Sequence, residues 1–152
     1  MKVLFLDIDG VVNSEECLKR GDAKGGILGI DPYLAFLVGK IILALPELKV
    51  VLSSSWRHWP NGRKTVGEKV CSIYDVTGSE PYLKELPNGV DNVQRGREIQ
   101  KWLDAHPEVE RYAILDDDSD MLPSQLPNFF KTSWKKGISE EIVSNVINHF
   151  LV

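Results

Sequence analysis

The sequence predicts an α/β fold: a Rossmann-like, three-layer sandwich in which helices cover a central parallel sheet of about five strands. Three observations lead to this prediction. Short apolar runs alternate along the chain with amphipathic helical segments. Several of these runs are followed at once by carboxylates or hydroxyls, at the edge where α/β sheets bind ligands. The chain has 152 residues, and because this length suits one domain we expect residues 1–152 to form a single one.

The predicted strands are short and mostly apolar. Residues 3–6 form a continuous apolar run, which is typical of a strand buried on both faces. Residues 50–52 and 112–115 repeat this character. Weaker patterns at residues 75–77 and 129–131 complete the set of five.

The first long helix has clear start and stop signals. Asp31 is a good N-cap, Pro32 fits the first helical position, and Pro46 ends the segment. One face is apolar with helical spacing, which predicts that it is buried. The residues of that face are Leu34, Leu37, Val38, Ile41, Ile42 and Leu45.

Three further helices are expected near residues 63–74, near residues 96–105 and after Ser139. Ser139 is an N-cap, and Glu140 and Glu141 favour the positive end of the helix dipole. The apolar stripe of this last helix consists of Ile142, Val143, Val146, Ile147, Phe150 and Leu151. Residues 13–30, with several glycines, and residues 81–93 read as loops.

Composition narrows the class of protein. The net charge of -4 argues against a surface built throughout for nucleic acid, although a local basic patch is compatible with it. Cys17 and Cys71 lack zinc-ligand spacing and indicate no disulfide framework. The longest apolar run, residues 41–45, is too short to span a bilayer, and the N-terminal segment does not resemble a signal peptide. We therefore expect a cytoplasmic protein with no membrane partner and no obligate protein partner.

Carboxylates and hydroxyls close three of the predicted strands: Asp7 and Asp9 after the first, Ser53 and Ser54 after the second, and Asp116, Asp117 and Asp118 after the strand at residues 112–115. If these strands are neighbours in the sheet, their ends converge in one crevice. Clustered carboxylates repel one another and need a cation, and an oxygen-only ligand set favours Mg²⁺ over zinc. Aspartates also serve as turn residues and caps, but two clusters that each follow an apolar strand favour a functional site.

The first cluster also suggests a reaction. Asp7 and Asp9 point the same way if the strand stays extended, and Gly10 allows a sharp turn after them. A carboxylate beside a metal-bound phosphate can attack phosphorus and form an aspartyl-phosphate. A second carboxyl can protonate the leaving oxygen and later activate water.

Four segments, in the family's order, resemble the motifs of the haloacid dehalogenase (HAD) superfamily of phosphohydrolases. Residues 7–12 resemble its first motif, DxDGV. Ser53 or Ser54 resembles the second, a hydroxyl that closes a strand, and Arg95 or Arg97 resembles the third, a basic residue at a helix start. Residues 114–117 resemble the fourth, a strand followed by an acidic pair.

Within this superfamily, residues 4–13, 52–57 and 114–118 are similar to the HAD domain of Swiss Army Knife RNA repair proteins. The resemblance implies a HAD-like domain with little or no cap, because the loops after the first two strands are short. The site would then be open, and capless members of the superfamily tend to act on large substrates.

The resemblance also implies a division of roles. Asp7 would be the nucleophile and Asp9 the general acid and base. Mg²⁺ would be bound by Asp7, the backbone carbonyl of Asp9, Asp116 and Asp117. The Ser of the second motif would bind the phosphoryl oxygens. The Arg of the third would neutralise them, and of Arg95 and Arg97 we favour Arg95 because it is nearer the helix start.

The expected function is therefore a Mg²⁺-dependent phosphomonoesterase acting on a small molecule, a nucleotide or a nucleic-acid end. Residues 56–59 and the nearby Arg63 and Lys64 interleave aromatic and basic side chains, a pattern that can stack bases and hold phosphates. The pattern is unspecific, and tryptophans packed in the core with charges facing solvent explain it more simply. A receiver-like phospho-switch, a catalytically silent binding module and a DxD-type glycosyltransferase are the alternatives. The DxDG pattern and the helix led by Arg fit the first of these poorly.

Overall fold

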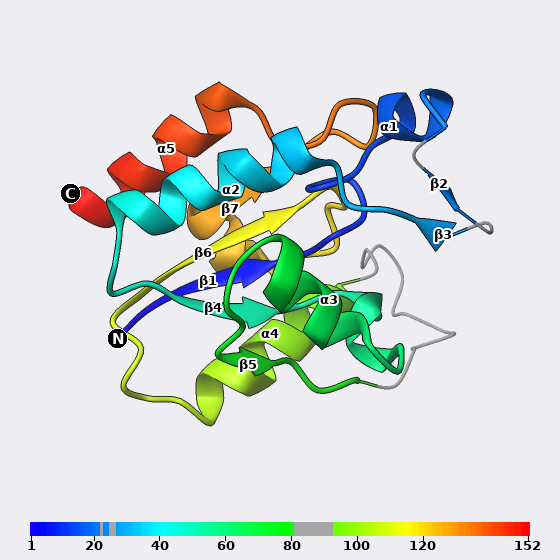
Figure 1. Cartoon of the computed structure of the whole chain (residues 1–152). Helices are drawn as coiled ribbons and strands as arrows, with labels where there is room; N and C mark the ends of the chain where they lie inside the picture. The colour runs from blue at the N-terminus through cyan, green and yellow to red at the C-terminus, as the bar shows by residue number, and fades with distance from the viewer. Residues whose placement is uncertain (22, 25–26, 81–92) are drawn as a thin grey trace.

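The computed structural model describes residues 1–21, 23–24, 27–80 and 93–152. Its centre is a five-stranded sheet in the order β5-β4-β1-β6-β7, in which every neighbouring pair is parallel (Figure 1). The strands are β1 (Lys2–Leu6), β4 (Lys49–Leu52), β5 (Asp75–Val76), β6 (Arg111–Asp116) and β7 (Phe129–Lys131). The α/β class and the parallel sheet of five strands are confirmed.

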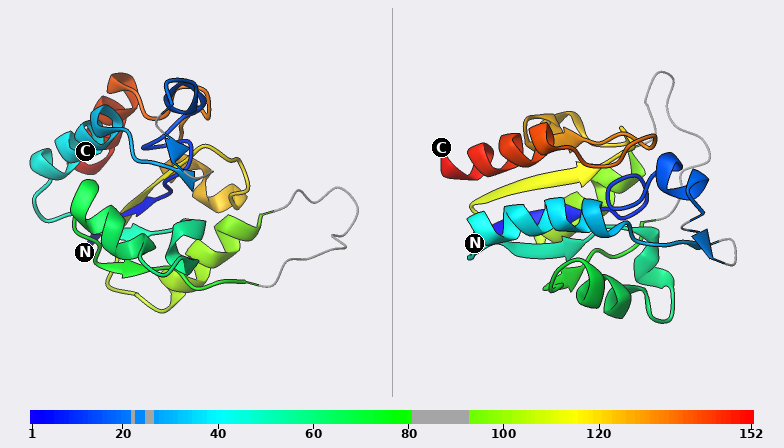
Figure 2. Two further views of the ribbon diagram at one scale, coloured as in Figure 1. Left: turned by 45° about the vertical axis from the view of Figure 1, so that its right-hand side comes forward. Right: turned by 45° about the horizontal axis from the view of Figure 1, so that its top comes forward.

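Helices cover both faces of the sheet. α2 (Pro32–Ala44) and α5 (Glu140–Leu151) lie on one face and α4 (Gln94–Asp104) on the other (Figure 2). α1 (Glu15–Lys19), α3 (Gly62–Lys69) and two 3₁₀ turns, η1 (Ser55–His58) and η2 (Pro123–Asn128), join these layers. β2 (Ala23–Lys24) and β3 (Ile27–Leu28) form a separate antiparallel pair near the carboxyl edge of the sheet.

The side chains of β1 alternate between two hydrophobic clusters. Leu4 and Leu6 join the cluster under α2 and α5, whereas Val3 and Phe5 join the one under α4. Period-two alternation on a strand covered on both faces produces this division. All four side chains are fully buried, so the end of β1 is held rigidly between the layers.

Several predicted elements match closely. α2 begins after Asp31, whose carboxylate accepts the Tyr33 N–H, and α5 begins after Ser139, whose hydroxyl accepts the Ile142 N–H.

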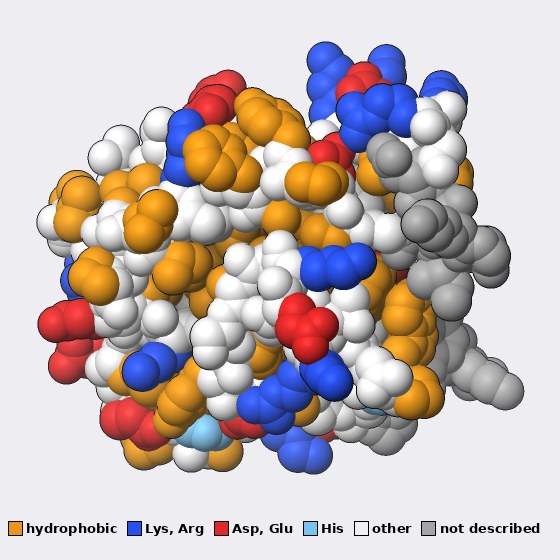
Figure 3. Space-filling view, viewed as in Figure 1, with side chains coloured by type: hydrophobic (Ala, Val, Ile, Leu, Met, Phe, Trp, Pro, Cys, Tyr) orange, Lys and Arg blue, Asp and Glu red, His pale blue; other side chains and the backbone are white. Residues whose placement is uncertain are grey.

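On the face drawn in Figure 3, hydrophobic side chains gather over α2, where Tyr33, Phe36 and Leu43 are exposed. Among the described residues, no helix is both long enough and apolar enough to cross a membrane.

Other predictions are wrong in their boundaries. The helix expected at residues 63–74 is α3 and ends at Lys69, because the chain then returns to the sheet, where the Tyr74 N–H donates to the Val50 carbonyl. The expected loop at residues 13–30 contains α1, which Ser14 caps by accepting the Cys17 N–H, and the β2-β3 pair. Leu151, placed in the apolar stripe of α5, is exposed at its end. Residues 81–92, most of the loop expected at 81–93, lie outside the described residues.

Candidate active site

The carboxyl ends of three neighbouring strands meet around the end of β1. β1 lies between β4 and β6, and Leu6 is in register with Leu52 and Leu115. The ladder continues one step further, because the Asp7 N–H donates to the Leu115 carbonyl at 3.0 Å and the Ser53 N–H donates to the Leu6 carbonyl at 2.9 Å. The predicted convergence of strand ends is therefore present.

Carboxylates line a small hollow at this edge. One carboxylate oxygen each from Asp7, Asp116 and Asp117 lies within 4.8 Å of the others. Asp7 and Asp116 are buried, and Asp117 is half-buried. The hollow measures about 160 Å³ and is lined by Asp7, Asp9, Ser55, Arg95, Asp116, Asp117, Asp118 and Asp120.

Burial raises the pKa values of these carboxyls above those of exposed aspartates. Desolvation raises the pKa of the Asp7 carboxyl to about 7, against the lowering effect of the Arg95 charge. Desolvation and then the charge of Asp7 raise the pKa of Asp116 to about 9. Burial also raises the pKa of Asp117 and of Asp120. Burial therefore favours the protonated form of these carboxyls, and the hollow is lined by more carboxyls than Arg95 can neutralise.

A tight turn after β1 places Gly10 directly against Asp117. Gly10 has φ +82°, and a Cβ at this position would collide with the Asp117 carboxylate, so both the backbone and the space require glycine. The Gly10 N–H donates to Asn13 Oδ1 at 2.9 Å, and the Thr132 hydroxyl donates to the Gly10 carbonyl at 2.6 Å. The turn expected after Asp9 is thus held from two sides.

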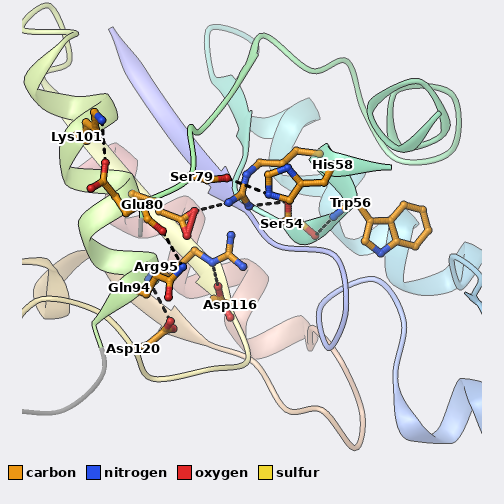
Figure 4. Close-up of polar contacts among 12 residues, drawn as sticks. Ser54, Trp56, His58, Ser79, Glu80, Gln94, Arg95, Lys101, Asp116 and Asp120 are labelled. Atoms are coloured by element: carbon orange, nitrogen blue, oxygen red, sulfur yellow. Dashed lines mark hydrogen bonds and ion pairs between the residues drawn. The ribbon is translucent and has the colours of Figure 1, made fainter. Parts of the chain in front are cut away.

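Arg95 enters the hollow from the first turn of α4. Its Nε lies 3.6 Å from Asp116 Oδ2, and its backbone N–H donates to Asp120 Oδ2 at 3.1 Å (Figure 4). The Gly96 N–H donates to the Asp120 carbonyl, and a Cβ on Gly96 would strike the backbone of Leu122. The start of α4 is therefore docked on the loop after β6, which aims Arg95 at the carboxylates.

Arg97 occupies a different place. Its Nη2 lies 3.5 Å from Glu80 Oε2, and the residue lines a separate hollow with Gln100 and Lys101. The helix starts at Gln94, two residues before the predicted position, so both arginines are helical. Because residues two apart on a helix do not share a face, Arg95 and Arg97 point in different directions.

The three serines after β4 differ in their partners. Ser54 accepts the Trp56 N–H at 3.2 Å, and its side chain is near enough to Asp7 to lower the pKa of that carboxyl. The Ser53 hydroxyl is fully buried and makes no hydrogen bond with the part of the chain that the structure describes. Ser55 lines the hollow, although only Ser53 and Ser54 were predicted as site residues.

The aromatic and basic side chains of residues 56–59 are divided between the interior and the surface of the protein. Trp56 is buried, and its indole N–H donates to Asp9 Oδ1 at 3.1 Å. Arg57 is buried too, forming an ion pair with Glu98 and donating to the Ser54 carbonyl at 2.8 Å. His58 lies 3.1 Å from the Ser79 hydroxyl. Trp59 and His58 are exposed, and the Trp59 ring centroid lies 4.8 Å from that of Trp56.

Sequence reasoning missed three contributors. Thr132 follows β7, and the rule of polar residues at strand ends that located Ser53 could have located it. Ser55 extends the hydroxyl run after β4 in the same way. The burial of Glu98 could not be predicted from the sequence, because a glutamate inside an amphipathic helix ordinarily faces solvent.

With this geometry established, comparison with known proteins assigns the family. Residues 3–143 match the family described as the HAD domain in Swiss Army Knife RNA repair proteins. The chain belongs to this HAD-domain family. The match covers most of the chain and supports a HAD-type hydrolase. Searches of curated proteins and of solved structures found no match.

Proposed function

We propose that this HAD domain is a Mg²⁺-dependent phosphomonoesterase that works through an aspartyl-phosphate on Asp7. The observation that carries the proposal is the setting of Asp7. It ends the central strand beside the carboxylates of Asp116 and Asp117, with the cationic Arg95 facing the same hollow. A nucleophilic carboxylate next to a cation site and a guanidinium is the arrangement that phosphoryl transfer requires.

The donor set fits Mg²⁺. The grouped ligands are all oxygens, and Asp116 Oδ2 is buried without a hydrogen bond from the described part of the chain. Asp7, Asp116, Asp117 and the backbone carbonyl of Asp9 would hold the ion. When bound, it would neutralise the carboxylates and the phosphate oxygens, which lets an anionic nucleophile approach an anionic substrate.

The chain's own residues account for both chemical steps. A carboxylate oxygen of Asp7 forms a bond to phosphorus while the bond to the leaving oxygen breaks, and Asp9 gives that oxygen a proton. Asp9 then takes a proton from water, whose oxygen attacks phosphorus and releases phosphate from Asp7. Arg95 offers positive charge to the transferring phosphoryl group. The Ser54 side chain, close to Asp7, favours the charged carboxylate that attacks.

The geometry favours Arg95 over Arg97 for the phosphate contact, because Arg95 lines the hollow and Arg97 is turned to Glu80. Of the two serines, Ser54 is the one whose side chain lowers the pKa of Asp7. Ser53 offers a buried hydroxyl that a phosphoryl oxygen could use, so we keep both as phosphate-binding candidates.

The test is hydrolysis of an aryl phosphate with and without Mg²⁺. We expect metal-dependent turnover and a transient phosphoenzyme, both lost in Asp7→Asn. Absence of turnover on aryl, nucleotide and oligonucleotide phosphates would overturn the proposal. A phosphoenzyme that survives for hours would instead support a receiver-like phospho-switch.

For the substrate class we propose a phosphate monoester on a small molecule or a nucleic-acid end. A second hollow of about 540 Å³, lined by Trp59, Arg63 and Lys64 among others, supports the nucleic-acid end. An exposed ring with cations nearby suits stacked bases and backbone phosphates. Hydrolysis rates on 5′- and 3′-phosphorylated oligonucleotides, compared with nucleotides, test this choice. Lys64→Ala should raise KM for the oligonucleotide and leave that for the nucleotide unchanged.

We also propose the cytoplasm as the working compartment. The two cysteines of the chain, Cys17 and Cys71, form no disulfide, which suits a reducing environment.

A further inference from the structure

The Asp9 carboxylate is held asymmetrically. The Asn13 side-chain amide donates to Asp9 Oδ1 at 2.8 Å, and the Trp56 indole N–H donates to the same oxygen at 3.1 Å. Both donors therefore meet one oxygen, and Oδ2 receives neither of them. Asp9 also lines the hollow that contains Asp7 and Arg95.

Both donors are themselves fixed by the fold. Asn13 is fully buried, and its Oδ1 accepts the Gly10 N–H, so its amide group has one orientation. Trp56 is buried in the main hydrophobic cluster and covered by Trp59. An exposed carboxylate could rotate about its side-chain bonds, but two donors from rigid positions hold this one in a single orientation.

We propose that Asn13 and Trp56 are positioning residues that fix Asp9 through Oδ1, so that Oδ2 is the oxygen that exchanges the proton with the leaving group. The inference rests on the proposed function, in which Asp9 is the general acid. As the bond between phosphorus and the leaving oxygen breaks, the proton passes from Oδ2 to that oxygen. Neither Asn13 nor Trp56 touches the substrate in this scheme.

The chain contains a matched control for Trp56. Trp102 is also buried, and its indole N–H donates to a carboxylate, Asp75 Oδ2, at 2.9 Å. Trp102 packs in the other hydrophobic cluster, and Asp75 is not among the residues that line the carboxylate hollow. Trp→Phe at either position removes one indole-to-carboxylate hydrogen bond and similar packing, but only the change at Trp56 affects Asp9.

The experiment compares kcat/KM for two substrates. Nitrophenyl phosphate has a leaving group that needs no proton, whereas a simple alkyl phosphate releases an alkoxide that does. We expect Trp56→Phe to lower kcat/KM for the alkyl phosphate about tenfold more than for the aryl one, a fraction of the hundredfold or more that general acid catalysis provides. Trp102→Phe should change both substrates by the same factor.

A second variant covers the case in which Trp56→Phe does not fold. Asn13→Asp keeps the shape and the acceptor for the Gly10 N–H but replaces the donor to Asp9, and it should show the same selective loss. Equal losses on both substrates in a folded variant would overturn the inference alone. A wild-type protein that hydrolyses neither substrate would overturn the proposed function, and this inference with it.

Discussion

Two arginines meet buried carboxylates near the end of β1, and their surroundings differ in charge. Arg57 and Glu98 form a pair that is 6% and 5% exposed, so one cation neutralises one anion. Arg95 instead faces a hollow that it shares with Asp7, Asp116, Asp117 and other carboxylates. The first region pairs one cation with one anion, whereas the second brings more carboxyls to the hollow than Arg95 can neutralise.

This difference separates stability from function. In a buried ion pair each charge compensates the other, so removal of one partner lowers the free energy of unfolding because an uncompensated buried charge remains. A cluster with excess negative charge costs folding free energy, which a protein tolerates where binding or catalysis needs it. Changes in the cluster should therefore affect activity first, and changes in the pair should affect stability first.

The largest effect should come from Asp7→Asn. Removal of the nucleophile should lower kcat by roughly four orders of magnitude or more. The free energy of unfolding should stay the same or rise, because one charge leaves a repulsive cluster. Activity assays and urea denaturation of the same preparation measure both quantities. A folded Asp7→Asn protein that still forms the covalent phosphoenzyme would contradict the assignment of Asp7.

Breaking the Arg57–Glu98 ion pair should instead lower stability more than activity. Arg57→Met leaves Glu98 buried without its partner and should lower the free energy of unfolding by about 3–5 kcal/mol. The double variant Arg57→Met, Glu98→Leu should recover most of that loss, because no unpaired charge remains. Urea denaturation of the three proteins measures this. A double variant as unstable as the single one would show that packing, not charge, decides the stability of this region.

The contrast also explains which features the sequence could predict. Asp7, Ser53 and Asp116 each follow an apolar strand, and the parallel sheet alone brings such strand ends together. The pairing of Arg57 with Glu98 joins η1 to α4 over 41 positions, and no local pattern records it. Trp56 illustrates the same limit: its neighbours suggested base stacking, but its indole N–H is turned inward to Asp9.

The two candidate arginines of α4 show how much depends on a helix boundary. The helix begins at Gln94 without a side-chain cap of its own. The carboxylate of Asp120, 25 residues later, accepts the Arg95 N–H instead. A cap supplied from a distant loop leaves no signature near the helix start, which is why the predicted start was two residues late.

A third pair of substitutions compares the roles of Arg95 and Arg97. Arg95→Gln should lower kcat/KM by a factor of about 10² to 10³, because it removes a cation that faces the transferring phosphoryl group. Arg97→Gln, at the matched position two residues later, should change kcat/KM less than about threefold, since Arg97 contacts Glu80. Steady-state kinetics on an aryl phosphate compare the two variants. Equal losses would mean that both arginines serve the site.

The smallest effect should appear in the pH dependence of stability without metal. The pKa of Asp7 is raised to about 7 and that of Asp116 to about 9, mainly by burial, against an ordinary value of 3.8. Between pH 4 and these values the folded protein binds more protons than the unfolded chain, so its stability falls as pH rises. Each carboxyl contributes a decrease of at most roughly 1.4 kcal/mol per pH unit.

Chemical denaturation at pH 5 and pH 8, in EDTA, measures this decrease. The double variant Asp7→Asn, Asp116→Asn is the control, because it removes these two carboxyls and keeps the other side chains of the protein. Mg²⁺ should reduce the decrease in the wild type, since it binds the charged carboxylates and only in the folded state. Wild-type stability that rises from pH 5 to pH 8 relative to the variant would mean that the cluster is already neutralised by the protein. The contrast between the two arginine regions would then be lost.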